Sequence, residues 1–373
     1  MKKILFLTGT RADFGKIKTL IQKLEDEESF EVHVFVTGMH LQWEYGYTLL
    51  EIERCEFKNV HTFGNHTHET TMDLTLARTI EGLSAYIKKI NPDMIVVHGD
   101  RVETLAGAIV GSLNNILVAH IEGGEVSGTV DELIRHSVTK LSHIHFVSNE
   151  AAGKRIEQMG EIGESIFVIG SPDVDLILSG ELPDIEEVKN YYDILYDEYA
   201  VAMFHPVTTE AAEMSQYAIN FTEALKKDEN NYVIIYPNND LGSSSILKEY
   251  EGLRRNPKFR IIPSLRFEYF LSLLKHSRFI IGNSSAGIRE APYFGKAIIN
   301  IGTRQNNRSQ QAEIINVGYN QKDILEALEL VQKQKMVPVT AEYGVGNSSD
   351  LFLAALNNNN LWKINHQKQF RDL

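Results

Sequence analysis

Residues 98–136 read HGDRVETLAGAIVGSLNNILVAHIEGGEVSGTVDELIRH, and the expected architecture follows from this stretch. Residues 93–97 (DMIVV) and 116–121 (ILVAHI) predict buried strands, because each is a short apolar run rich in Val and Ile. A helix of small apolar residues is predicted over 104–113, and a second helix over 131–140. Strands that alternate with helices in this way indicate a parallel α/β sheet.

Polar residues follow both predicted strands, in the turns HGDR and EGGE. In an open parallel sheet, ligands bind beyond the carboxyl ends of the strands, so Asp100, Glu122 and Asp131 are expected in one crevice. Carboxylates gathered in this way would raise one another's pKa and supply an acid and a base at neutral pH. Arg101 and Arg135 could keep the remaining carboxylates ionised. The structural alternative is a solvated rim.

Length and composition exclude several classes of protein. A chain of 373 residues is too long for one typical core, so two domains are expected. The net charge of −13 argues against nucleic acid and anionic membranes as partners. Cys55 is the single cysteine, which excludes an intramolecular disulfide and a cysteine-based zinc site. The apolar run in MKKILFLTGT is too short for a signal peptide and predicts the first strand, so a cytoplasmic protein without a membrane span is expected.

The turn GTRADFGK follows this first strand and precedes a helix. It looks like a phosphate loop but fails the Walker pattern, since Ile17 follows Lys16 where Ser or Thr is needed. Arg11, Asp13 and Lys16 still lie at the carboxyl end of a strand, beside a helix N-terminus suited to anions. The alternative is that Asp13 caps the helix and the two cations are solvated.

Three histidines suggest a metal site, but the pattern around them does not support one. His61, His66 and His68 are expected in a polar loop that has neither helical ligand spacing nor a cysteine. A solvated or substrate-covering loop is therefore the preferred interpretation. Together with His40 and Gln42, His66 is a candidate for selecting the substrate.

A second α/β domain is predicted after an acidic, proline-containing segment near residue 175. The expected domains are 1–175 and 176–349, with the C-terminal helix of about 350–373 able to pack back on the first. Four predicted strands of the second domain end in HPVTTE, PNNDLGSSS, GNSSAG and GTRQNNR. These donor-rich turns predict one ligand laid across the edge of the second sheet.

The turn GNSSAG is the clearest candidate for binding phosphate. Gly282 and Gly287 would allow close backbone approach, and Ser284 and Ser285 offer hydroxyls and amides at a helix N-terminus, which favours a diphosphate. The alternative is an ordinary helix cap, because GNSS recurs at 346–349 before another predicted helix.

The other three turns offer weaker candidates. His205 could touch a phosphate or act as an acid, but a histidine satisfied within the core is an equal alternative. Arg304 could pair with a phosphate or simply lie on the surface. Asn238, Asn239 and Asp240 could contact a base or ribose, although turns use these residue types without any ligand.

The motifs GTRADFGK, HGDR, HIEGGEVSGTVDELIRHSVTKLSH, HPVTT, PNND, IIGNSS and NIGTRQ, in this order, resemble those of the hydrolysing UDP-sugar 2-epimerases. This family includes UDP-N-acetylglucosamine 2-epimerase of sialic acid biosynthesis. The resemblance runs from Lys3 to about Arg308. MFHPVTTE, IYPNNDLG and PSLRFEYF look closest to the branch that acts on UDP- or GDP-N,N'-diacetylbacillosamine in legionaminic acid synthesis.

The resemblance implies two Rossmann-like domains of the glycosyltransferase B type, with an active site in the interdomain cleft and the nucleotide held mainly by the second domain. It implies elimination of UDP to a glycal, addition of water and release of a free manno-configured sugar, without metal or cofactor, in a homodimer or homotetramer. By motif position it makes Asp100, Glu122, Asp131 and His205 the catalytic residues. With the patterns above, the predicted substrate-binding residues are Arg11, Asp13, Lys16, Arg101, Arg135, Asn238, Asp240, Ser264, Ser284, Ser285, Glu290 and Arg304, of which Ser264 and Glu290 rest on the resemblance alone.

Three alternatives stay open at this point. A non-hydrolysing 2-epimerase would share the motifs but keep UDP on its product. A glycosyltransferase of the same architecture would share the nucleotide site but need an acceptor. A nucleotide-sugar sensor would bind without turnover. The identity of the sugar and of the nucleoside is open as well.

Overall fold

The computed structural model describes residues 1–66, 71–306, 308, 313–334 and 337–371. The chain divides into two compact units, each built on its own sheet. Unit 1 consists of Met1–Glu125, Asp131–Ser179 and Glu342–Leu373, and unit 2 of Val126–Val130 and Gly180–Ala341. The boundary between the two units therefore lies at Ser179, whereas the sequence predicts it near residue 175.

Unit 1 contains a sheet of seven strands, all parallel, in the order β3-β2-β1-β4-β5-β6-β7 among the described residues. Its strands are β1 (Lys2–Thr8), β2 (Phe30–Val36), β3 (Val60–Thr62), β4 (Met94–His98), β5 (Leu117–Ile121), β6 (Ile144–Val147) and β7 (Ile166–Val168). Its helices are α1 (Arg11–Glu25), α2 (Leu49–Glu53), α3 (Met72–Ile90), α4 (Val102–Leu113), α5 (Val130–Leu141), α6 (Glu150–Gln158), α7 (Pro172–Leu178) and α14 (Ser348–Leu356).

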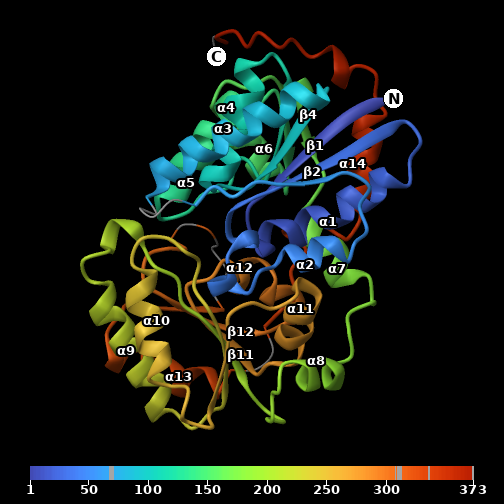
Figure 1. Cartoon of the computed structure of the whole chain (residues 1–373). Helices are drawn as coiled ribbons and strands as arrows, with labels where there is room; N and C mark the ends of the chain where they lie inside the picture. The colour runs from blue at the N-terminus through green and yellow to red at the C-terminus, as the bar shows by residue number, and fades with distance from the viewer. Residues whose placement is uncertain (67–70, 307, 309–312, 335–336, 372–373) are drawn as a thin grey trace. The chain divides into compact units, whose positions relative to one another are not determined.

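Helices cover both faces of this sheet, with α1 and α14 packed together on one face and α3 and α4 on the other (Figure 1). Side chains alternate along the strands, so Phe6 of β1 points toward α14. There the ring of Phe352 lies 6.3 Å from Phe6 and 4.7 Å from Phe146. The C-terminal helix thus completes the core of unit 1. It ends at Leu356 rather than near residue 373, because four asparagines, which are poor helix formers, follow it.

Unit 2 contains a sheet of six parallel strands in the order β10-β9-β8-β11-β12-β13 among the described residues. Its elements are α8 (Ile185–Tyr191), β8 (Ala200–Met203), α9 (Met214–Lys227), β9 (Tyr232–Ile235), α10 (Ser243–Glu251), β10 (Phe259–Ile262), α11 (Phe267–His276), β11 (Phe279–Gly282), α12 (Ala286–Arg289), β12 (Ala297–Ile301), β13 (Ile314–Val317) and α13 (Gln321–Val331). Helices α9, α10 and α13 pack together on one face, and α8 and α11 on the other (Figure 1). The doubly wound α/β class expected from the sequence is confirmed in both units.

Two local expectations are wrong. The first helix begins at Arg11, within the GTRADFGK segment that was expected to precede it, because Thr10 caps it and forms a reciprocal capping box with Asp13. His61 lies in strand β3, not in a loop, and its ring stacks on Tyr86 at 4.2 Å. His68 lies outside the described residues. Among the helices that the structure describes, none is long and apolar enough to cross a membrane.

The second GNSS sequence (346–349) is a helix cap that is already satisfied within unit 1. Both carboxylate oxygens of Asp175, which lies in α7, accept a backbone hydrogen bond at 2.8 Å, one from Ser348 and one from Ser349. The carboxylate therefore occupies the N-terminus of α14, where an anion is stabilised.

We expect Asp175→Ala to lower the free energy of unfolding of unit 1 by about 1–3 kcal/mol, since two partly buried backbone amide groups lose a charged acceptor. Asp350→Ala is the matched control on the same helix. Its carboxylate is 68% exposed and pairs with Lys23 at the surface, so its loss costs under about 1 kcal/mol. Urea unfolding of both variants checks this, and equal losses would contradict the capping role.

Candidate active site

Asp100 and Glu122 follow the carboxyl ends of neighbouring strands, as the sequence predicts. Strands β4 and β5 are paired in parallel, with His98 of β4 opposite Ile121 of β5. The backbone amide of Gly99 donates to the carbonyl of Ile121 at 3.0 Å, which ties the HGDR turn to the neighbouring strand. The two carboxylates therefore lie along the same edge of the unit 1 sheet.

Asp100 is held by a buried arginine. Nη2 of Arg135, on α5, donates to Oδ2 of Asp100, and Nη1 donates to the carbonyl of Glu125 at 3.1 Å. The Arg135 side chain is 1% exposed and that of Asp100 is 25% exposed. The guanidinium favours the ionised form of Asp100 while the carboxylate keeps contact with solvent. The structure thus brings Asp100 and Arg135 together.

Glu122 is held in a second, more buried cluster. Nζ of Lys16 lies 3.1 Å from its Oε1 and 3.7 Å from Oδ2 of Asp173, and Oγ of Ser171 donates to the same Oε1 at 3.2 Å. The φ of Glu122 is +67°, a left-handed conformation that is uncommon outside glycine. Backbone strain of this kind persists only where the surroundings fix it, and it concentrates at functional sites.

His98 is a buried residue beside Glu122 that the sequence reasoning missed. Its Nε2 lies 3.3 Å from Oε1 of Glu122. Among the described residues, neither ring nitrogen has a hydrogen-bond partner. Its place directly before the GDR motif is the signal that could have identified it. Ser171 and Asp173 were missed too, since GSPDVD reads only as a break in the pattern.

Asp13 has a local structural role. Its carboxylate accepts hydrogen bonds from the amides of Gly9 and Thr10 at 3.0 and 3.1 Å and from Oγ1 of Thr8 at 2.5 Å. His40 lies behind the same turn, where its Nε2 is 3.0 Å from Oγ1 of Thr8, and burial lowers its pKa to about 4. Both side chains support the GTRADFGK turn.

The other residues predicted in unit 1 lie at the ends of helices or in loops. Arg11 begins α1, Asp131 lies in the first turn of α5, and Arg101 caps α4. Nε of Arg101 lies 3.4 Å from Oε2 of Glu103, a carboxylate that is 3% exposed and that the sequence reasoning missed. Nε2 of Gln42 contacts His66 at 2.7 Å, so these two loop residues are linked.

In unit 2, the ends of β9, β8, β11 and β12 lie side by side, because these strands are neighbours in the sheet. Asn283 connects their turns. Its Oδ1 accepts from the amide of His205 at 2.6 Å, and its Nδ2 donates to the carbonyl of His205 at 2.8 Å. Its own carbonyl accepts from Arg304 at 3.2 Å and from Gln305 at 2.9 Å. This fully buried asparagine therefore positions His205 and Arg304 along one edge.

The tautomer of His205 follows from its contacts. The backbone amide of Asn238 donates to Nδ1 of His205 at 3.1 Å, so Nδ1 is the acceptor and the ring proton lies on Nε2. Nδ2 of Asn238 in turn donates to Asp240 at 2.5 Å. Oδ1 of Asn238 is buried and has no hydrogen-bond partner among the described residues. His205, Asn238 and Asp240 thus form one connected group.

The GNSSAG turn is built differently from the expectation. A Cβ on Gly282 would lie 1.9 Å from the carbonyl of Met203, and one on Gly287 would lie 3.2 Å from Ile298. Both glycines therefore allow close packing of strand and helix within unit 2. Helix α12 is a single turn, with Oγ of Ser284 accepting from the amide of Ala286 at 3.3 Å.

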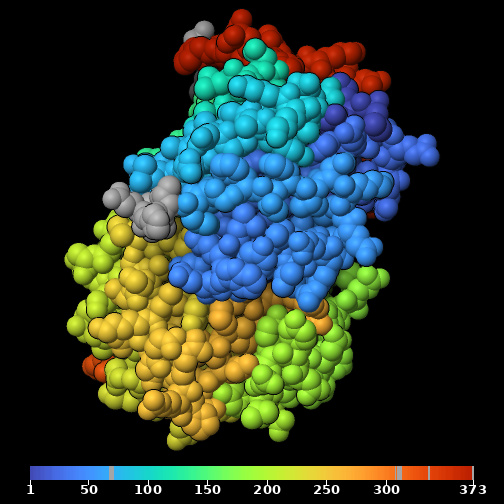
Figure 2. All heavy atoms as spheres, in the orientation of Figure 1, coloured from blue at the N-terminus to red at the C-terminus, as the bar shows by residue number. Residues whose placement is uncertain are grey.

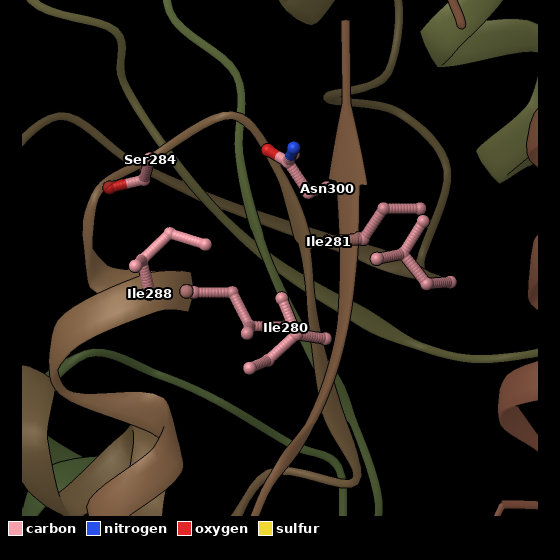
Figure 3. Close-up of a pocket in the computed structure, with 9 residues that line it drawn as sticks. Ile280, Ile281, Ser284, Ile288 and Asn300 are labelled. Carbon is pink, nitrogen blue, oxygen red and sulfur yellow. The ribbon is translucent and has the colours of Figure 1, made fainter. Parts of the chain in front are cut away.

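A small cavity lies behind this turn, between α12 and strands β11 and β12 (Figure 3). Figure 3 shows Ser284 on the turn, with Ile280 and Ile288 between strand and helix. The residues that line the cavity are mostly isoleucines: Ile280, Ile281, Gly282, Ser284, Gly287, Ile288, Ile298, Ile299 and Asn300. Such a lining does not suit a nucleotide, so the polar groups of interest are those on the sheet edge.

The remaining predicted residues of unit 2 flank this edge. Ser285 caps α12, Glu290 follows it and is 3% exposed, and Ser264 follows β10. Within the described part of the chain, no group of three or more His, Cys, Asp or Glu side chains is arranged to hold a metal ion. The two edges offer paired carboxylates in unit 1 and hydrogen-bond donors in unit 2.

Comparison with known proteins gives a consistent result. A family model described as UDP-N-acetylglucosamine 2-epimerase matches residues 22–357. A Neisseria meningitidis protein named UDP-N-acetylglucosamine 2-epimerase is 48% identical over 376 residues, which cover 100% of both chains. A Legionella pneumophila protein named UDP-N,N'-diacetylbacillosamine 2-epimerase (hydrolyzing) is 33% identical over 355 residues, 94% of each chain.

The solved structure of Methanocaldococcus jannaschii UDP-GlcNAc 2-epimerase, in complex with UDP-GlcNAc and UDP, matches with a TM-score of 0.82. The identity is 23%, and the match covers 95% of this chain and 99% of that one. This likeness agrees with the fold class expected from the sequence.

Proposed function

The chain belongs to the UDP-N-acetylglucosamine 2-epimerase family, and on this premise we propose that it is a hydrolysing UDP-sugar 2-epimerase. Its reaction would convert UDP-N-acetylglucosamine and water to UDP and a free N-acetylmannosamine-type sugar. The observation that carries the proposal is the pair Asp100 and Glu122, which follow adjacent strands and each contact a cation, Arg135 and Lys16.

The proposed first step is an elimination. The hydrogen at C2 of the sugar is barely acidic, so its removal has to accompany loss of a good leaving group. A carboxylate takes this proton, the bond between C1 and the phosphate oxygen breaks, and UDP departs with the electron pair as a C1–C2 double bond forms. Carboxylates near C1 would also stabilise the positive charge that develops there. We assign these tasks to Asp100, Glu122 and Asp131.

Residues of unit 2 would assist the departure of UDP. Charge develops on the leaving phosphate oxygen, and donors fixed in advance stabilise it without reorganisation. His205, with its proton on Nε2, Arg304, and the hydroxyls of Ser284 and Ser285 are such donors. Arg11, Lys16 and Arg101 are the corresponding cations of unit 1. Asn238, Asp240, Ser264 and Glu290 would contact the nucleoside.

The proposed second step is addition of water to the glycal. A proton is delivered to C2 on the opposite face, and hydroxide adds at C1, which gives the free sugar with inverted C2. The Legionella relative supports this mode, since its name states that it is hydrolyzing. A non-hydrolysing epimerisation, in which UDP adds back, is the second candidate, because the 48% identical relative is named only as an epimerase.

Incubation of the purified chain with UDP-N-acetylglucosamine in deuterated water tests the proposal. We expect UDP and a free manno-configured sugar carrying deuterium at C2. Epimerised sugar that remains attached to UDP would indicate the non-hydrolysing mode, and absence of any C2 exchange would reject a 2-epimerase. Sugar transfer to an added acceptor would indicate a glycosyltransferase.

The preferred sugar and nucleoside follow from a side-by-side comparison of kcat/KM. UDP-N-acetylglucosamine, UDP-N,N'-diacetylbacillosamine and its GDP analogue are the substrates to compare. The names of the two relatives favour the first two. A homodimer or homotetramer is proposed as well, and sedimentation of the full chain tests it.

A further inference from the structure

The last described residues of the chain form a tail that lies on unit 1. Residues 364–371 follow the short helix Leu361–Lys363 and have no regular structure. Figure 2 shows the tail, in red, on the surface of unit 1. The ring of Phe370 is 91% exposed, so this end of the tail is not held by burial of an apolar side chain.

Lys368 of the tail caps the C-terminal end of α5. Its Nζ donates to the carbonyls of Thr139 at 3.3 Å, Lys140 at 3.0 Å and Ser142 at 2.6 Å. The last carbonyls of a helix have no partner within the helix, and a cation at this end also interacts favourably with the helix dipole. Lys368 therefore donates hydrogen bonds to carbonyl groups at the C-terminal end of α5, the helix that carries Asp131 and Arg135.

A buried carboxylate fixes the position of Lys368. Oε2 of Glu161 lies 2.5 Å from its Nζ, and Lys140 and His145 contact the same carboxylate at 2.7 and 3.2 Å. Burial alone would raise the pKa of Glu161, but these hydrogen bonds and charges outweigh it and lower the pKa to about 2. Glu161 is therefore ionised and holds Lys368 throughout the neutral range.

Further hydrogen bonds attach the tail to unit 1. The amide of Val118 donates to Nδ1 of His143, so the Nε2 proton of His143 donates to the carbonyl of His366 at 3.0 Å. Nη1 of Arg371 donates to the carbonyl of Glu161 at 3.1 Å. The tail is therefore held to unit 1 by polar contacts at His366, Lys368 and Arg371.

The held end of α5 is linked to the HGDR turn. Oγ1 of Thr139 lies 3.2 Å from Nδ1 of His120, and Nε2 of His120 lies 2.9 Å from the carbonyl of Gly99, next to Asp100. Burial lowers the pKa of His120. From the other side, Arg135 of α5 binds the Asp100 carboxylate itself. A shift of α5 would thus reach Asp100 along two routes.

We propose that Lys368 is a positioning residue, which holds α5 so that Arg135 and Asp131 keep Asp100 and the sugar ring in reacting geometry. The expected effect of Lys368 on turnover rests on the proposed function, whereas its expected effect on α5 does not. Small displacements from a remote change can reduce turnover by up to about 10²-fold.

Three full-length variants test this role: Lys368→Met, which removes the charge, Lys368→Arg, which retains it, and the control Lys363→Met. Lys363 is exposed, and its Nζ lies 3.5 Å from Oδ1 of Asn360 at the surface. We expect Lys368→Met to lower kcat about 10- to 100-fold with KM unchanged, since the nucleotide residues are untouched. Lys368→Arg should restore most of the loss, and Lys363→Met should match the unmodified chain.

Hydrogen exchange of residues 130–141 supplies a readout that does not depend on activity. Lys368→Met should exchange faster there than the unmodified chain or Lys363→Met. If Lys368→Met folds poorly, Thr139→Ala breaks the link to His120 and should lower kcat in the same way.

Unchanged exchange over α5, or an unchanged kcat in Lys368→Met, would overturn the inference. If the unmodified chain releases no UDP, the proposed function fails while the exchange result still decides whether the tail holds α5.

Discussion

Asp100→Asn is expected to lower kcat about 10²–10⁴-fold, the usual cost of removing a positioned proton-transfer group. The amide has nearly the same shape but neither accepts the C2 proton nor carries the negative charge opposite Arg135. Affinity for UDP should be unchanged, because Asp100 is not among the residues proposed to contact UDP. Steady-state kinetics and calorimetric titration with UDP measure the two quantities.

Asp93→Asn is the matched control for this substitution. Asp93 precedes the same strand β4 at its other end, where its carboxylate accepts from Lys2 at 3.0 Å and from the amide of Lys3 at 2.8 Å. Its loss affects folding but not the proposed chemistry, so kcat per folded molecule should be unchanged. Equal kcat in Asp100→Asn and the unmodified chain would remove Asp100 from the mechanism. Loss of turnover with retained UDP binding would exclude a sensor.

His205→Ala is expected to lower kcat about 10²–10³-fold, the typical cost of removing one donor from a site of developing negative charge. The ring proton lies on Nε2 because Nδ1 accepts the amide of Asn238. This proton would stabilise the phosphate oxygen as the bond to C1 breaks. For substrates whose leaving group is better than UDP, His205→Ala should lower kcat less. Measuring kcat of the variant and the unmodified chain on such substrates tests this.

His276→Ala serves as the control within unit 2. His276 ends α11, just before β11 begins, and its Nδ1 lies 2.9 Å from the carbonyl of Ser272. It is therefore at the amino end of a strand, away from the donor-rich edge. Similar losses of kcat in both variants would indicate a general effect on unit 2 and contradict the role of His205.

The strands and their polar turns could be predicted from sequence because both signals are local. Apolar runs rich in Val and Ile mark buried strands, and the parallel arrangement then aligns their carboxyl ends. This reasoning placed Asp100 and Glu122 correctly at the ends of neighbouring strands. Asp13 and Gly287 also have local structural roles, Asp13 at the start of α1 and Gly287 in packing against Ile298, which their motifs alone did not indicate.

The residues that sequence reasoning missed act over long separations. Asn283 bridges to His205, 78 positions away, and Lys368 reaches the carbonyl of Ser142, 226 positions away. Neither residue type is unusual in its local sequence. Their roles arise from contacts between segments far apart in the chain, which the local sequence does not reveal.

Each unit is built from separate segments of the chain, and this limits how two related proteins can be recombined into a working hybrid. Unit 2 takes in Val126–Val130, whose Gly128 amide donates to the carbonyl of Arg304 at 3.1 Å. Unit 1 takes back Glu342–Leu373, which carries Phe352 and Lys368. A single recombination crossover near Gly180 would therefore join one parent's sheet to another parent's core aromatic and tail lysine. Hybrids that work should inherit the first and last segments together.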